Sequence, residues 1–220
     1  MNVSDALVAR RSVRAFLDTP LEPGIVARLA NQAARAPSGG NLQPWRIWHL
    51  PGASMHRFRR QMSTRLDQGQ SDTPEYPVYP PDLHPPYRDH RFAVGEAMYA
   101  RLGIERSNKA ERLNWFAENY RFFGAPDALF VFVDRRMRPP QWSDLGMFLQ
   151  SFMLLCTEQG IATCAQEAWA LHHAFVSEFC DVPSDLMLFC GCAIGYEDKD
   201  HRVNRLQTDR APLDDWFTTL

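Results

Sequence analysis

Three arginines and one serine lie within five residues near the start of the chain and could bind an anion. They are Arg10, Arg11, Ser12 and Arg14. Guanidinium groups carry planar sets of N–H donors that match the oxygen atoms of a phosphate, and the serine hydroxyl adds one more donor. The cluster is therefore a candidate phosphate site, although a solvated basic turn would have the same residues.

Two further stretches hold polar residues that a hydrophobic core does not require. Between residues 36 and 45, small residues let the backbone approach a flat ligand, and the amides of Asn41 and Gln43 both donate and accept hydrogen bonds. Near the C-terminus the chain adds further cationic and amide side chains. These are Asn204, Arg205 and Arg210.

Several common catalytic motifs are absent. The chain contains neither G-x-G-x-x-G nor G-x-x-x-x-G-K-[ST], the glycine-rich sequences of Rossmann and P-loop nucleotide sites, and no G-x-S-x-G. His172 and His173 are adjacent, so on a helix they point about 100° apart and do not form a metal-binding pair. Cys190 and Cys192 share one face of a predicted strand, where we expect core packing. We therefore predict no metal site.

The composition describes a chain that can bury a core and has little net charge. The 220 residues carry 24 Lys and Arg against 26 Asp and Glu, a net charge of −2, and 45% of them are hydrophobic. A near-neutral chain does not favour binding to nucleic acids. Four of the five cysteines lie in or beside apolar runs, which is typical of reduced thiols. With no signal pattern and no membrane span, we expect a soluble, cytoplasmic protein that binds neither nucleic acid nor membranes.

The spacing of apolar residues predicts the elements that must position these candidates. Helices are expected at 4–10, capped by Ser4, from Pro23 to near Pro37, at 54–67, at 91–123 as one or two helices, from a Ser143 cap to about 159, and at 168–180. Strands are expected at 45–50, 128–133 and 186–194. This order predicts a mixed α/β domain with long helices around a modest sheet.

Some segments do not fit a single core. Residues 69–87 hold six of the 16 prolines and three tyrosines, which favours a covering loop, or lid, or else a mobile surface insertion. The helix at 143–159 has almost no polar face, so it lies in a core or in a subunit interface. The polar tail ends in Leu213, Trp216 and Phe217, which need a further surface, such as that of a partner subunit.

Six stretches, in their order along the chain, resemble the nitroreductase family of FMN-dependent oxidoreductases. They are RRSVRAF at 10–16, APSGGNLQPW at 36–45, FGAP at 123–126, GIATCAQEAW at 160–169, GCAIGY at 191–196 and RAPL at 210–213. The resemblance covers nearly the whole chain apart from the proline- and tyrosine-rich segment.

The resemblance implies an α+β (mixed α/β) fold in which a central mixed sheet is surrounded by long helices. One nitroreductase-like domain is expected to span residues 1–220, with the insertion at about 69–90 and an extended C-terminal arm at about 198–220. It also implies a homodimer that exchanges this arm and binds two FMN molecules in its interface, each lined by both subunits.

The resemblance further implies roles for the candidate residues. Arg10, Ser12 and Arg14 correspond to the group that holds the FMN phosphate and the pyrimidine side of the ring, with Arg11 contributing charge or backbone contacts. The tail residues expected at or near the phosphate are Arg210, Asn204 and Arg205.

The remaining site residues are expected on either side of the flavin. The other subunit is expected to supply Pro37, Ser38, Gly39 and Asn41, with Gln43 nearby. The segment Gln166, Glu167 and Ala168 corresponds to the flavin edge, where a backbone N–H meets N5, and Ala165 stands where many relatives have proline. No catalytic side chain is expected.

The implied activity is a ping-pong reaction in which NAD(P)H is the co-substrate. Hydride passes to FMN and then to an electron-poor acceptor such as a nitroaromatic compound or a quinone. Aromatic residues of segment 69–92 are candidates for the walls of the acceptor pocket, unless they only pack the insertion. The alternatives are a reductive dehalogenase or enone reductase of the same fold, or a flavin-binding or storage protein without turnover.

Overall fold

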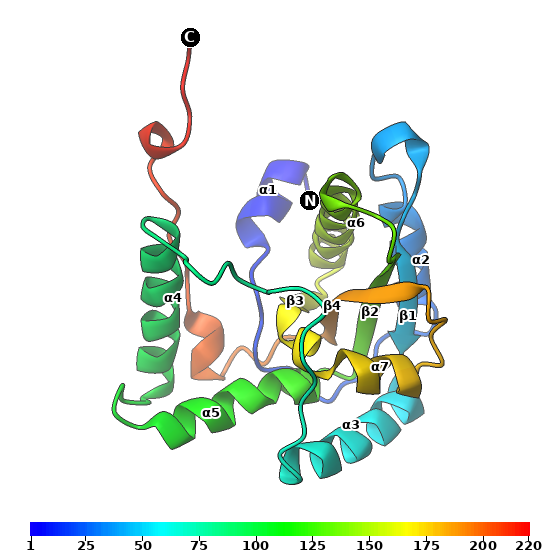
Figure 1. Cartoon of the computed structure of the whole chain (residues 1–220). Coiled ribbons are helices and arrows are strands. Elements are labelled where there is room, and N and C mark those ends of the chain that lie inside the picture. Colours follow the sequence, from blue (N-terminus) through cyan, green and yellow to red (C-terminus); the bar gives the residue numbers. More distant parts are fainter.

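A four-stranded antiparallel sheet in the order β1-β2-β4-β3 lies at the centre of the molecule (Figure 1). The computed structural model describes all residues from 1 to 220. The strands are β1 (Arg46–Leu50), β2 (Asp127–Asp134), β3 (Ala162–Gln166) and β4 (Leu186–Gly195). The predicted fold class is confirmed as α+β, but the prediction of a mixed sheet is wrong. All three strand pairs are antiparallel, and the one parallel contact is an isolated bridge between Ser12 and Thr163.

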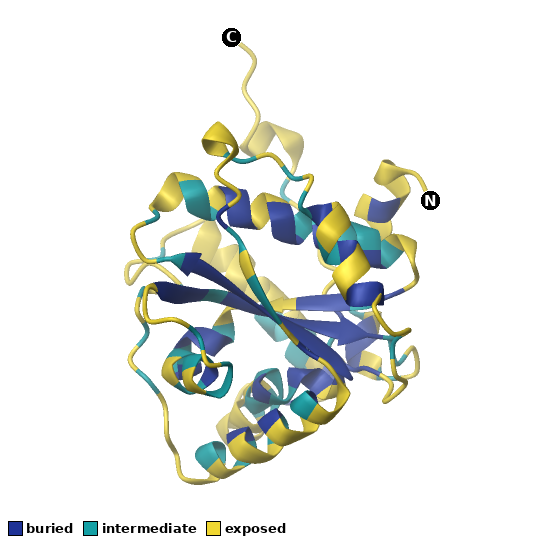
Figure 2. Ribbon diagram, turned by 90° about the vertical axis from the view of Figure 1, so that its right-hand side faces the viewer, coloured by how far each residue is buried: buried dark blue, intermediate teal, exposed yellow.

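Seven α-helices surround the sheet. They are α1 (Val3–Ala9), α2 (Ile25–Ala33), α3 (Gly52–Asp67), α4 (Tyr87–Leu102), α5 (Lys109–Ala117), α6 (Pro139–Glu158) and α7 (His173–Phe179). Figure 2 shows the buried strands between two layers of helices whose buried sides face the sheet. No helix is both long enough and apolar enough to cross a membrane.

Strand β2 serves both layers because alternate residues of a strand point to opposite faces. Phe130 and Phe132 pack with α3 and α7 on one face. Val131 and Val133 pack with α2 and α6 on the other. The continuous apolar run predicted at 128–133 is thus explained by burial on both faces.

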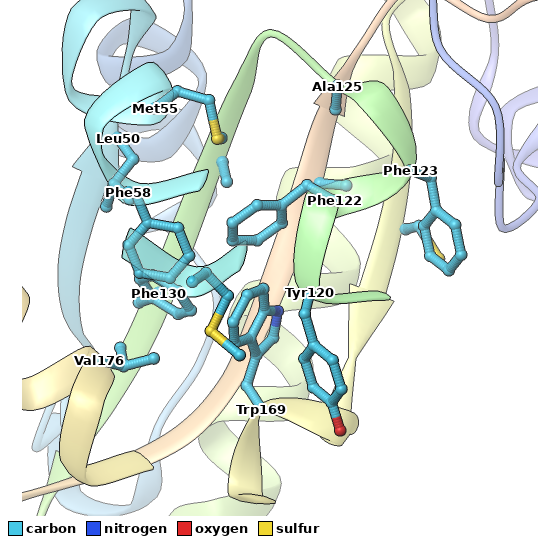
Figure 3. Packing of buried hydrophobic residues seen from close by; sticks show 14 of the residues in the cluster. Leu50, Met55, Phe58, Tyr120, Phe122, Phe123, Ala125, Phe130, Trp169 and Val176 are labelled. Carbon is cyan, nitrogen blue, oxygen red and sulfur yellow. The ribbon is translucent and has the colours of Figure 1, made fainter. Parts of the chain in front are cut away.

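An aromatic cluster fixes the turn that follows β3 (Figure 3). Trp169, in the 3₁₀ turn Glu167–His172, is fully buried and packs against Phe58, Phe122 and Phe130. The indole lies so close to β4 that a Cβ at Gly191 would approach Trp169 Cδ1 to 2.4 Å. Glycine is therefore required at this point of the strand, and it lets Trp169 hold the turn against the sheet.

Several predicted boundaries are wrong. Helix α1 is capped by Asn2 and not by Ser4, and α6 begins four residues before Ser143, which bonds to the Pro140 carbonyl inside the helix. Strand β3 was not predicted. The single helix predicted at 168–180 is a 3₁₀ turn followed by the short helix α7.

The proline-rich segment is tied to the body over its first part. Asp72 forms an ion pair with Arg65 and accepts a hydrogen bond from the backbone of Ala174 at 2.9 Å. The Tyr76 hydroxyl donates to the Phe189 carbonyl of β4, and its ring packs against Trp142. These contacts favour the covering loop over the mobile insertion for this part.

The last residues leave the body of the chain as an extended arm (Figure 1). Trp216 and Phe217 of this arm are 67% and 56% exposed. The arm follows the 3₁₀ turn Arg202–Arg205, which packs on α4.

Candidate functional site

The segment after α1 runs beside the sheet in an extended form. Val13 donates its N–H to the Thr163 carbonyl of β3 at 3.1 Å, and Val13 and Ala15 are buried. Because alternate residues of an extended segment face opposite ways, Arg10, Ser12 and Arg14 share the other side. Burial raises the pKa of the Cys164 thiol in β3, while Arg14, Ser12 and Arg10 oppose this shift. All three thus lie around one residue of β3.

Most of the arginines in this region have no carboxylate partner. Arg11 forms an ion pair with Glu197. Arg10 and Arg205 have no side-chain hydrogen bond or ion pair, and Arg14 has only a 3.4 Å contact to the Ser12 carbonyl. Their guanidinium donors are therefore available for an anion, whereas those of Arg11 are partly used by Glu197.

Asn204 uses its amide inside the chain. Its Oδ1 accepts from the Arg14 N–H at 2.8 Å, and its Nδ2 donates to the carbonyls of Ala15 and Asp198, both at 2.8 Å. The residue is 4% exposed. Both amide donors are occupied, so Asn204 positions the backbone of Arg14 and has no donor left for a ligand.

The residues expected at the flavin edge are the last residue of β3, Gln166, and the two that follow it, Glu167 and Ala168. The Gln166 side chain is buried, donates to the Asn119 carbonyl at 2.7 Å and accepts from Trp169 Nε1 at 3.4 Å. Glu167 and Ala168 begin a 3₁₀ turn that has no side-chain cap, so their N–H groups lack a partner within the turn. Glu167 is exposed at the surface, but partial desolvation by its surroundings still raises its pKa.

The loop at residues 37–43 lies elsewhere. The Gly39 N–H donates to Asp144 Oδ2 at 3.2 Å, near the start of α6, and the Ser38 hydroxyl accepts from the Gln43 N–H at 3.0 Å. Helix α1 instead packs near Leu155, toward the far end of α6. At 1.5 Å per residue, these two points are about 16 Å apart along α6. One chain therefore does not bring this loop to the Arg10–Arg14 group.

Arg210 also lies apart from that group. Its guanidinium donates only to Thr208 and to the Asp209 carbonyl, both within the exposed arm. Nothing in the single chain brings it to Arg14.

A cavity of about 510 Å³ opens between Arg14, α4, α5 and the turn Glu118–Gly124. Two aromatic residues of segment 69–92, Tyr79 and Phe92, line it, whereas Tyr76 packs away from it against Trp142. Sequence reasoning missed the lining residues of α4, of α5 and of the turn Glu118–Gly124. One signal in the sequence could have identified the residues on the helices. These helices carry aromatic side chains but have no continuous apolar stripe that would bury them in a core. The missed residues include Arg88, Arg91, Trp115, Phe116 and Asn119.

The donor set beside β3 fits FMN, a flat ring joined to a terminal phosphate. Unpaired guanidinium groups of Arg10 and Arg14 suit the phosphate, and open N–H groups at Glu167 and Ala168 suit polar atoms at the ring edge. The buried Thr163 hydroxyl between them has no hydrogen-bond partner in the chain. Cations, open donors and an unpartnered hydroxyl along one strand are consistent with this group.

Known proteins match this chain over nearly its whole length. Residues 7–196 match the family model described as Nitroreductase family. The chain is 34% identical over 209 residues to a 4-nitrobenzoate reductase of Pseudomonas putida, covering 94% of this chain and 90% of that protein. It is 32% identical over 223 residues to a nitrobenzene nitroreductase of Ectopseudomonas oleovorans, covering 99% and 96%.

A solved structure has the same fold over the whole chain. The FMN and NADPH-dependent nitroreductase NfnB from Sphigopyxis sp. strain HMH superposes with a TM-score of 0.96 at 45% identity, covering 100% of this chain and 99% of that chain.

Proposed function

The chain belongs to the nitroreductase family, and from this membership we propose that it is an FMN-dependent enzyme that uses NADPH to reduce nitroaromatic compounds. The observation that carries the proposal is the unpaired cationic set of Arg10 and Arg14 beside β3, next to the open N–H groups of Glu167 and Ala168. Relatives described as nitroaromatic reductases over almost the full length support the substrate class.

The proposed mechanism needs little from side chains. FMN bound here would supply the redox chemistry, carrying hydride equivalents between NADPH and the acceptor. Arg10, Ser12 and Arg14 would hold the phosphate, and the N–H groups of Glu167 and Ala168 would donate to the ring edge and so favour its electron-rich form. Asn204 and Gln166 position these groups through the backbone. No side-chain nucleophile or general base is required.

We also propose that the working unit is a homodimer with the site shared between subunits. In it, the loop with Pro37, Ser38, Gly39, Asn41 and Gln43 faces the Arg10–Arg14 group of the other chain. The 16 Å separation estimated along α6 supports this, because a single chain leaves the two halves apart. Apolar residues exposed on α1 and α4, such as Val8 and Phe92, support a covered surface.

The arm is proposed to exchange between subunits of this dimer. It belongs to a single domain over residues 1–220, and its exposed Trp216 and Phe217 support docking on the partner. Exchange would also bring Arg210 toward the phosphate end of the partner's site, where Arg205 of that partner already lies near its Asn204. The five cysteines are free thiols and four are buried, which supports a reducing compartment such as the cytoplasm.

A visible spectrum of the purified protein tests the activity. We expect flavin absorption that bleaches when NADPH is added without oxygen and returns when a nitroarene follows. A flavin that NADPH does not bleach would instead indicate a binding or storage protein. Return of the colour with an enone or a halogenated aromatic, and not with a nitroarene, would favour the related reductases of this fold.

Hybrid dimers test the shared site. One chain carries Arg10→Ala and Arg14→Ala, and the other carries Gly39→Leu, whose side chain meets nothing within 4 Å in its own chain. Each homodimer should lose FMN. Random mixing makes half of the dimers hybrid, each with one unaltered site, so about a quarter of the sites should regain FMN. A mixture without any FMN would refute a site built from both chains.

A further inference from the structure

The cavity of about 510 Å³ beside Arg14 is also lined by two arginines, Arg88 and Arg91, that the proposed phosphate site does not use. Arg14, Arg88 and Arg91 line it together with a single carboxylate, Glu96. Both oxygens of Glu96 accept from Arg112, at 2.5 and 3.0 Å, and this pairing lowers the pKa of Glu96. Arg112 does not line the cavity. The carboxylate is therefore occupied, and the arginines of the cavity have no balancing charge within it.

Arg91 is held in a pose that leaves its donors free. Its guanidinium carbon lies 4.0 Å from the centre of the Tyr79 ring, and it forms no ion pair. Stacking on an aromatic ring engages the face of a guanidinium group, so the N–H donors around its edge stay available. A planar carboxylate is the group that such an edge binds with two parallel hydrogen bonds.

Arg88 adds a second cation one turn earlier on the same side of α4. Its Nε lies 3.1 Å from Asp89 Oδ1, but the two side chains are 62% and 60% exposed. An ion pair so accessible to water is weak. Arg88 is therefore free to add attraction for an anion at Arg91.

The rest of the lining suits an aromatic ring. Phe92, Phe116 and Phe123 are among its residues, and its volume exceeds that of a substituted benzene ring. Asn119 also lines the cavity and holds Gln166, the residue before the proposed flavin edge. The cavity thus reaches from the neighbourhood of the flavin edge to the arginines of α4.

We propose that Arg91, assisted by Arg88, binds the carboxylate of nitroaromatic acids and makes them preferred acceptors over uncharged nitroarenes. This rests on the proposed function and names the substrate class for it. The nitro group of such an acid would face the flavin end while the carboxylate pairs with Arg91. NADPH also carries anionic phosphates that Arg91 could bind. The experiment therefore measures reduction of the flavin by NADPH separately from its reoxidation by the acceptor.

The test compares Arg91→Gln with Arg101→Gln, which removes the same charge from the same helix outside the cavity. Flavin reduction by NADPH and by NADH is followed without oxygen, and then reoxidation by 4-nitrobenzoate and by nitrobenzene. Wild type should favour 4-nitrobenzoate. In Arg91→Gln, reoxidation of the flavin by a low concentration of 4-nitrobenzoate should be slower by about 10- to 100-fold. The rate of reoxidation by nitrobenzene should stay within about twofold of wild type. Arg101→Gln should change neither reaction.

A binding measurement adds a readout without turnover. Benzoate, which is not reduced, should perturb the spectrum of the oxidised flavin, and Arg91→Gln should raise its Kd by a similar factor of about 10 to 100. Equal Kd values in the two proteins would overturn the proposal.

Two kinetic outcomes would also overturn it. One is that Arg91→Gln changes the rates of flavin reoxidation by 4-nitrobenzoate and by nitrobenzene equally, or changes neither rate. The other is that Arg91→Gln slows only the reduction of the flavin by NADPH and leaves both reoxidation rates unchanged. The anion bound at Arg91 would then be a phosphate of the dinucleotide. In both cases NADPH still bleaches the wild-type flavin, so the proposed function stands. A wild-type flavin that NADPH does not reduce would reject the proposed function itself.

Discussion

Replacing Asn204 with alanine should destabilise the protein even when no FMN is bound. The substitution removes three hydrogen bonds, from the Arg14 N–H and to the carbonyls of Ala15 and Asp198. It leaves these backbone groups without partners at a place where Asn204 is 4% exposed. At about 1 kcal/mol for each bond, the free energy of unfolding should fall by about 3 kcal/mol. Affinity for FMN should fall as well, because the Arg14 backbone loses its anchor.

Urea unfolding of the FMN-free proteins measures this loss. With a slope near 3 kcal/mol per molar urea, the midpoint should move down by about 1 M. Wild type and variant are compared at one protein concentration, since association with a second chain would shift both midpoints. Asn108→Ala is a matched control, because it removes only exposed contacts to Glu111 at the start of α5. The control should lose about 1 kcal/mol or less.

The opposite pattern would refute this reasoning. If FMN-free Asn204→Ala unfolds at the wild-type midpoint and only its FMN affinity falls, Asn204 is a ligand contact and not a positioning residue. The hydrogen bonds to Arg14, Ala15 and Asp198 would then contribute nothing measurable.

Four further outcomes are expected. Arg10→Ala and Arg14→Ala should each weaken FMN binding by about 10- to 150-fold, measured by fluorescence titration, because each removes a charge-assisted contact; unchanged binding would reject the phosphate assignment. Removal of residues 207–220 should shift the protein to a smaller species on size exclusion, and an intact dimer would show that the arm is not needed for association. Gly191→Ala should lower stability by about 1–3 kcal/mol in urea, because the new Cβ meets the indole of Trp169, and an unchanged midpoint would mean that the indole moves aside freely. Burial and nearby Arg65 lower the pKa of His172 to about 4. As pH drops, His172 is therefore protonated in the unfolded chain at a higher pH than in the folded chain, and the free energy of unfolding should fall between about pH 6.5 and 4. His172→Gln should flatten that part of the profile, and a profile of unchanged slope would exclude His172 as its cause.

The sequence predicted the elements that carry strong local signals. The apolar runs of β2 and β4 and the helices α3 and α6 are found close to their expected positions, because burial on a sheet or along a stripe leaves a regular pattern. Strand β3 was missed since Ala162–Gln166 is short and mixes small and polar residues. Its burial comes from the neighbouring β4 and from the Ser12 bridge, which a local pattern does not contain.

The candidate site was predictable as residue types and less so as contacts. Arg10, Ser12 and Arg14 lie together, because the period of an extended segment places them on one side. Asn204 and Gln166 look like ligand residues in the sequence, but their partners are backbone groups far away in the chain, on Arg14 and Asn119. Only the fold reveals that both amides are already occupied. The prediction of a mixed sheet was likewise wrong. Helices between strands occur in sheets with parallel pairs and in antiparallel sheets, so the order of elements does not determine the strand directions.

The length of α6 has a consequence for how the protein behaves on dilution. Because this helix keeps the 37–43 loop away from the Arg10–Arg14 group in each chain, FMN would bind the pair of chains more tightly than the separate chain. Ligand binding and association are then linked, so each strengthens the other by the same factor. Retention of colour would depend on protein concentration, and dilute enzyme would lose its flavin together with its partner. Added FMN would restore both at once.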